Sequence, residues 1–173
     1  SYNPSAEELS GLNSDYENFI KEFGISSVTA TVLRDKALLK AYYFAQYDTA
    51  ILLLENILAL PKLNSLLAGQ CKLDLGDIYV IMGNEWDATL YYSQVDKSFK
   101  DDPLAHEARF RNARLSFFNG DFEWAKAQLD ILKSATSELI ANNAVNLSVL
   151  IMDNLNLDTT DVPLKMYAKA DLL

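Results

Sequence analysis

Side chains suited to nucleophilic or metal chemistry are scarce in this sequence. His106 is its only histidine and Cys71 its only cysteine. Chemistry built on an imidazole needs a second group held close to it, and none can be nominated because these two residues fall in different predicted helical hairpins. We therefore expect His106 to be solvated on a helix surface, and Cys71 to be a buried thiol rather than a reactive one.

Acidic residues occur in close pairs, such as Asp74 with Asp77 and Glu7 with Glu8. A general acid–base pair would need an apolar pocket that shifts the pKa of one carboxyl group. The sequence around these pairs shows no such pocket, so we interpret them as parts of solvated helix faces.

Two short segments resemble sites but lack the residues that would make them work. In Asn154–Asp158, a calcium loop fails because Thr159 replaces the required glycine and Lys165 the bidentate acid. We expect a helix end and a polar turn there. Asn146-Leu147-Ser148 is a glycosylation triplet inside a predicted helix, which we attribute to chance. With no glycine-rich phosphate loop, the sequence predicts no enzymatic activity, no cofactor and no metal.

The composition is typical of a folded domain that does not bind polyanions. Half of the 173 residues are hydrophobic, and 8 Phe, 9 Tyr and 2 Trp provide material for a core. The net charge of −9 disfavours nucleic acid and anionic membrane surfaces. Because no apolar run is long enough to cross a bilayer, no direct membrane insertion is expected. A protein partner remains open, and a lone cysteine permits either cytoplasm or periplasm.

The elements that must position any site are helices. Apolar residues recur at helical spacing, and Gly and Pro residues interrupt them. Helix caps are expected at Asp48, Asn64, Asn84 and Asp121, and Pro103 is expected at the first position of a helix. The fold class is therefore all-α, with short connections that make neighbouring helices antiparallel. About nine helices are expected, near 9–23, 28–45, 50–60, 64–82, 84–99, 104–119, 121–133, 137–155 and from 161 onward.

One pattern recurs three times along the chain. A small residue at a turn is followed by Ala after five positions and by large apolar residues after nine and twelve. The three copies are Ala45, Ala50, Leu54, Ile57; Gly83, Ala88, Tyr92, Val95; and Gly120, Ala125, Leu129, Leu132. We expect the three alanines to be buried where two helices touch.

The middle copy, with Leu75-Gly76, Tyr79, Gly83, Ala88 and Tyr92, resembles the tetratricopeptide repeat. The resemblance implies a right-handed stack of antiparallel helix hairpins, an α-solenoid, as a single array over 1–173. Its clearest repeats are 28–62, 69–103 and 104–134, with flanking helices in 1–24 and 137–173.

The segments 86–95 and 106–113 are similar to those of long multi-repeat proteins of Bacteroidota. The chain would then be a piece excised from a longer protein. The compartment stays unknown, although the resemblance slightly favours the periplasm or cell envelope.

In this repeat family, ligands usually lie along the concave groove, against the first helix of each hairpin. The resemblance therefore implies an aromatic, mildly acidic groove that suits an apolar helix or a basic extended segment. Tyr43 and Phe118 could equally belong to the core, and for Phe110 and Phe117 the core is favoured. The candidate partner-binding residues are Tyr42, Tyr43, Gln70, Asp77, Ile81, Glu107, Arg114 and Phe118.

Two functions are consistent with these patterns. The favoured one is a non-catalytic scaffold that binds a peptide or helix of another protein. The alternative is an accessory helical domain of a cell-envelope protein that recognises a glycan or small molecule. At the ends of the array, exposed Leu164, Met166 and Leu172 are expected to drive weak self-association.

Overall fold

The computed structural model describes residues 4–100, 102–134, 138–157 and 161–172, and these contain nine α-helices and no strand. The all-α prediction is confirmed. The chain divides into two compact units, 1–83 and 84–173, and each is described by itself. The division falls between the two helices of the predicted repeat 69–103, so the pairing of those helices stays a prediction.

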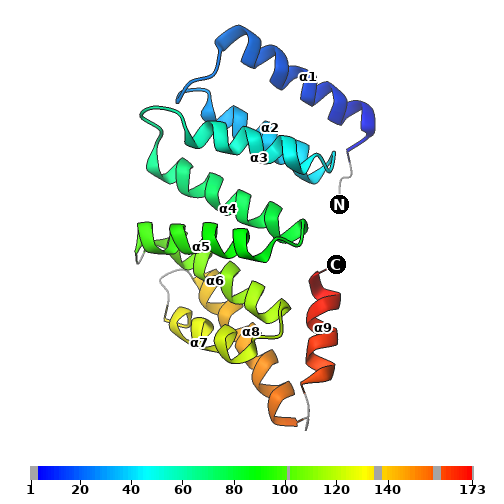
Figure 1. Ribbon diagram of the computed structural model, residues 1–173, viewed down its shortest axis with the longest axis vertical. Coiled ribbons are helices and arrows are strands. Elements are labelled where there is room, and N and C mark those ends of the chain that lie inside the picture. Colours follow the sequence, from blue (N-terminus) through cyan, green and yellow to red (C-terminus); the bar gives the residue numbers. More distant parts are fainter. Residues whose placement is uncertain (1–3, 101, 135–137, 158–160, 173) are drawn as a thin grey trace. The chain divides into compact units, whose positions relative to one another are not determined.

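The first unit contains α1 (Ala6–Phe23), α2 (Ala30–Tyr42), α3 (Tyr47–Leu58) and α4 (Ser65–Ile81) (Figure 1). Successive helices contact one another, and α2 also contacts α4. Ser5 and Glu8 form a reciprocal capping box at the start of α1. As predicted, Asn64 caps α4, because its side chain accepts hydrogen bonds from the backbone N–H groups of Leu66 and Leu67.

The second unit contains α5 (Glu85–Phe99), α6 (Pro103–Phe118), α7 (Phe122–Leu132), α8 (Glu138–Leu157) and α9 (Val162–Leu172). Pro103 occupies the first turn of α6, as expected, and Asp102 caps that helix. The central element is α6, which contacts α5, α7, α8 and α9.

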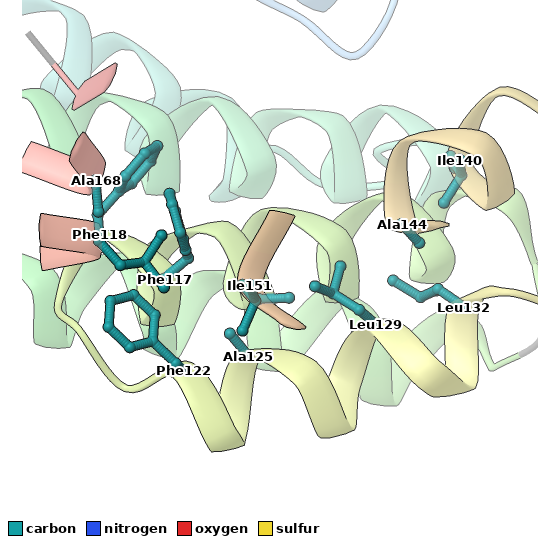
Figure 2. Packing of buried hydrophobic residues seen from close by; sticks show 12 residues of the cluster. Phe117, Phe118, Phe122, Ala125, Leu129, Leu132, Ile140, Ala144, Ile151 and Ala168 are labelled. Carbon is teal, nitrogen blue, oxygen red and sulfur yellow. The ribbon is translucent and has the colours of Figure 1, made fainter. Parts of the chain in front are cut away.

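A hydrophobic core joins α6, α7, α8 and α9 (Figure 2). Phe117 is 1% exposed in this core, with ring centroids of Phe118 and Phe122 at 5.8 and 5.7 Å. Leu164 of α9 is buried in the same cluster. The prediction that Leu164 is available for self-association is therefore wrong, because Leu164 and Ala168 of α9 pack into the core of their own unit. Met166 remains exposed.

The threefold sequence pattern has the same local structure in each copy. The turn residues Ala45, Gly83 and Gly120 all adopt positive φ, at 50°, 75° and 81°. The residue after each begins the next helix as its N-cap, with φ/ψ of −94/65, −92/71 and −85/60°. The alanines five positions after the turns, and the large residues after nine and twelve, are all buried. The predicted burial of Ala50, Ala88 and Ala125 is confirmed.

Three predicted capping interactions are absent. Asp48 lies inside the first turn of α3, because the helix already starts after Gln46. Neither Asn84 nor Asp121 makes a side-chain capping bond at its N-cap position. Their ψ values, near 60–70°, differ from the extended geometry that Ser5 and Asp102 adopt when they cap. The repeated turn geometry, rather than side-chain capping, therefore defines where these helices begin.

Ala45 is the one turn residue of the three that is not glycine, and its φ of 50° is strained for an L-residue. Relief of that strain should stabilise the folded state by about 1–2 kcal/mol. This gain should exceed the free-energy cost of the extra chain entropy that glycine gives to the unfolded state. We expect Ala45→Gly to raise the free energy of unfolding by about 0.5–1 kcal/mol, measured by urea denaturation.

The matched control for this substitution is Gly83→Ala. Gly83 has a φ of 75°, and a Cβ there would meet no atom within 4 Å, so only backbone strain should act. Gly83→Ala should lower the free energy of unfolding by about the same amount as Ala45→Gly raises it. A loss of stability in Ala45→Gly would contradict the shared turn geometry.

Candidate functional site

A groove of about 370 Å³ lies between α6 and α8 in the second unit. Each wall is one face of a helix. Residues three or four positions apart lie on the same face of a helix, so each helix contributes one stripe of side chains to the groove. The α6 wall provides Phe110 and Arg114. The α8 wall provides Asn143, Asn146, Leu147 and Leu150.

The groove combines an apolar floor with a polar rim. Phe110, Leu147 and Leu150 are half-buried and pack against the hydrophobic core of the unit. Asn146 and Arg114 are exposed. The floor can therefore accept an apolar side chain, while the Asn carboxamides can both donate and accept hydrogen bonds at its edge.

Arg114 gives the groove a positive charge. Its guanidinium lies over the Phe118 ring, 5.3 Å from the centroid. Arg114 forms no ion pair with any acidic residue that the structure describes. Its charge is thus available to a carboxylate from outside the chain.

The predicted residues of the third repeat separate into different roles. Glu107 pairs with Arg111 one turn later on α6, at 2.9 Å, so it adds no free acid to this groove. Phe118 is 9% exposed and belongs to the core, and Phe117 is a core residue as favoured. The interpretation of Phe118 as a groove anchor is wrong, because α9 packs over this end of α6. Of the groove positions predicted for the third repeat, Arg114 lines the groove, and so does Phe110, for which the core was favoured.

The predicted residues of the first unit differ in their exposure to solvent. Tyr42, Tyr43 and Ile81 are exposed at helix ends, while Gln70 and Asp77 of α4 are half-buried. Tyr43, for which core and surface were equally open, is a surface residue. None of the five lines the cavity formed by residues 45–49 and Met82 in this unit, and their role in binding stays a prediction.

Cys71 is fully buried near the ion pair between Arg34 and Asp74. Arg34 of α2 donates two hydrogen bonds to Asp74 of α4, at 2.5 and 3.0 Å. Burial, and next the nearby Asp74 carboxylate, raise the pKa of the Cys71 thiol to about 12. The thiol is therefore protonated and unreactive at neutral pH, which confirms its interpretation as a core residue.

Two expectations about polar residues are wrong. Asp74 does not lie on a solvated face, since it is 6% exposed and paired with Arg34. His106 is half-buried, and its Nδ1 atom is buried without a hydrogen-bond partner among the described residues. His106 is half-buried because α6, the helix that carries it, contacts four other helices. Glu7 and Glu8 are exposed as expected.

The two motif-like segments both involve α8. α8 continues through Asn154 to Leu157, two residues beyond the predicted end, and residues 158–160 of the calcium-like segment lie outside the described residues. Ser148 of the glycosylation triplet is fully buried within α8. Within the described part of the chain there is no group of three or more His, Cys, Asp or Glu residues that could hold a metal ion.

The sequence patterns did not predict the α8 wall of the groove. Residues 137–173 lack the repeated turn pattern, so no groove positions could be transferred to them. A signal was nevertheless present: Asn143, Asn146, Leu147 and Leu150 occur at spacings of three and four, which places polar and apolar residues along one edge of a helix.

No protein-family model, curated protein or solved structure matches this chain. None of the described helices has the length and apolarity required to span a bilayer. The features that bear on function are therefore the groove itself and the repeated local structure.

Proposed function

We propose that this chain is a non-catalytic protein-interaction module of tetratricopeptide type, and that its α6–α8 groove binds an extended segment of another protein. The observation that carries the proposal is the lining of this groove, where an apolar floor, two carboxamides and a guanidinium with no acidic partner among the described residues lie together. The partner segment would carry a large apolar side chain and a nearby Asp or Glu.

The repeated local structure supports the repeat architecture in this proposal. The three turns share positive φ values and the same N-cap geometry, and the three following helices bury equivalent residues. Alternate helices also contact one another within each unit, α2 with α4 and α6 with α8. Contacts between alternate helices are expected when helical hairpins stack on their neighbours.

The chemistry of the groove favours an extended peptide as its occupant. Asn143 and Asn146 lie three residues apart on α8, and a carboxamide can pair with both the N–H and the C=O of a peptide backbone. An extended segment keeps those groups free, whereas a helix uses them internally. Arg114 adds a preference for a carboxylate, in place of the basic segment that the sequence favoured.

Selection of short random peptides displayed on phage tests this proposal. Peptides that bind the full chain should be enriched in an acidic residue and a large apolar residue. Asn146→Ala should weaken their binding by about tenfold or more, since it removes a backbone partner from the centre of the interface.

The matched control is Asn142→Ala, one turn earlier on the same helix. Asn142 is also exposed but does not line the groove, so its replacement should leave binding unchanged. Two results would contradict the proposal: the absence of any enriched peptide, or equal affinity of the enriched peptides for Asn146→Ala and the unaltered chain.

A further inference from the structure

A second cleft, of about 320 Å³, lies in the second unit on another face of α6. Its walls come from the first turns of α5 and α7 and from the C-terminal half of α6. The α6 residues Asn112 and Ser116 that line it lie on the opposite side of the helix from Phe110 and Arg114. The two clefts are therefore separate surfaces.

Both tryptophans of the chain line this second cleft. Trp86 of α5 is 88% exposed and Trp124 of α7 is 59% exposed. Tryptophan is usually largely buried, because its ring gives up a large apolar area to water when exposed. Two exposed indoles at one cleft mark a surface that is suited to a ligand.

Four carboxylate or carboxamide side chains line the cleft together with the two indoles. Glu85, Asn112, Asn119 and Asp121 line the cleft, and none of their side chains forms a hydrogen bond or ion pair with a residue that the structure describes. Asp121 is an N-cap residue, yet its carboxylate makes no capping bond. The cleft thus offers carboxylate acceptors and carboxamides that are both donors and acceptors.

We propose that this cleft binds a neutral carbohydrate, one or two sugar rings of an oligosaccharide. The C–H groups on one face of a sugar carry partial positive charge and pack against the electron-rich face of an indole. The hydroxyl groups at the sugar edge both donate and accept hydrogen bonds, which matches the mixture of Asp, Glu and Asn. A volume near 320 Å³ lies at the lower end of the range for ligand pockets.

The side chains that line the cleft favour a neutral sugar over two alternative ligands. No Lys or Arg lines the cleft, so the carboxylates of Glu85 and Asp121 would repel a phosphate or sulfate group. A quaternary ammonium ion would suit the indoles and carboxylates. It cannot form hydrogen bonds, however, and would leave the carboxamides of Asn112 and Asn119 unpaired when it displaced water.

Intrinsic tryptophan fluorescence of the chain tests this inference directly, because its two tryptophans both line the cleft. The probes are neutral oligosaccharides of glucose, N-acetylglucosamine and xylose, titrated to about 10 mM, a range that covers weak binding. At least one should change the emission saturably. Asn119→Ala should lower its affinity by about fivefold or more, and Trp124→Ala should abolish the remaining Trp86 response.

Asn142→Ala, an exposed substitution on α8 outside the cleft, should leave the sugar affinity unchanged. Circular dichroism of each variant checks that the helices are intact. The inference is overturned if no oligosaccharide in the set changes the emission. It is also overturned if tetramethylammonium binds and the sugars do not, or if Asn119→Ala and Asn142→Ala behave alike.

Discussion

Replacement of Phe117 by alanine should lower the free energy of unfolding by about 3–5 kcal/mol, as core aromatic truncations do. Phe117 is 1% exposed, and the rings of Phe118, Phe122 and Tyr167 surround it. The loss would be a large share of the stability of an ordinary domain, about 5–15 kcal/mol. Urea denaturation followed by circular dichroism measures it.

Phe23→Ala is the matched control, because Phe23 is an exposed phenylalanine at the end of α1. It should cost no more than about 1 kcal/mol. Phe118→Ala should resemble Phe117→Ala in unfolding experiments, since both rings belong to one core. If Phe117→Ala unfolds at the same urea concentration as Phe23→Ala, the packing of α6 in Figure 2 is wrong.

The second large effect is expected in the first unit, at the ion pair between Arg34 and Asp74. Asp74→Ala should destabilise the chain by about 2–4 kcal/mol, because it leaves a partly buried guanidinium without its carboxylate. The Arg34 and Asp74 side chains are only 22% and 9% exposed. Chemical denaturation of the single variant gives the cost.

A second bidentate Arg–Asp pair provides the control. Arg109 of α6 donates two hydrogen bonds to Asp96 of α5, but both side chains are at least one quarter exposed. Asp96→Ala should therefore cost about 1 kcal/mol or less. The double variant Arg34→Met/Asp74→Leu should recover most of the lost stability, since no charge is left buried. Equal costs for Asp74→Ala and Asp96→Ala would contradict the role of burial at the Arg34–Asp74 pair.

Local signals in the sequence predicted the helices and much of their burial. Asn64 and Pro103 indicated helix starts because capping depends on adjacent residues. The alanines after Ala45, Gly83 and Gly120 were expected to be buried because a repeated register places equivalent residues at equivalent contacts. These features depend on residues close together in the chain.

The features that the sequence did not predict depend on distant residues. Arg34 and Asp74 are forty positions apart and meet only when α2 packs against α4. The burial of Leu164 depends on α9 folding back onto α6. The sequence shows that Leu164 is apolar, but it does not show which surface covers that side chain.

The candidate groove was predicted on one side only. Arg114 was identified on the α6 wall, whereas Asn143 and Asn146 lie on α8, where no repeat could be recognised. Phe118 was assigned to the groove or the core with equal weight. A side chain of α6 can face the groove or the core, and the sequence does not show where a later helix packs. The two tryptophans of the second cleft come from different helices, and their proximity is a tertiary property.

In the proposed complex, Arg114 holds a carboxylate of the peptide in the α6–α8 groove, and a charge exchange tests this contact. Two peptides are compared: a selected acidic peptide, and the same peptide with its acidic residue replaced by lysine. The dissociation constant of each peptide is measured with the unaltered chain and with Arg114→Glu. We expect each single exchange to weaken binding by about tenfold or more and the double exchange to restore most of it. Additive losses, with no recovery in the double exchange, would show that Arg114 does not contact the acid and would contradict the proposed function.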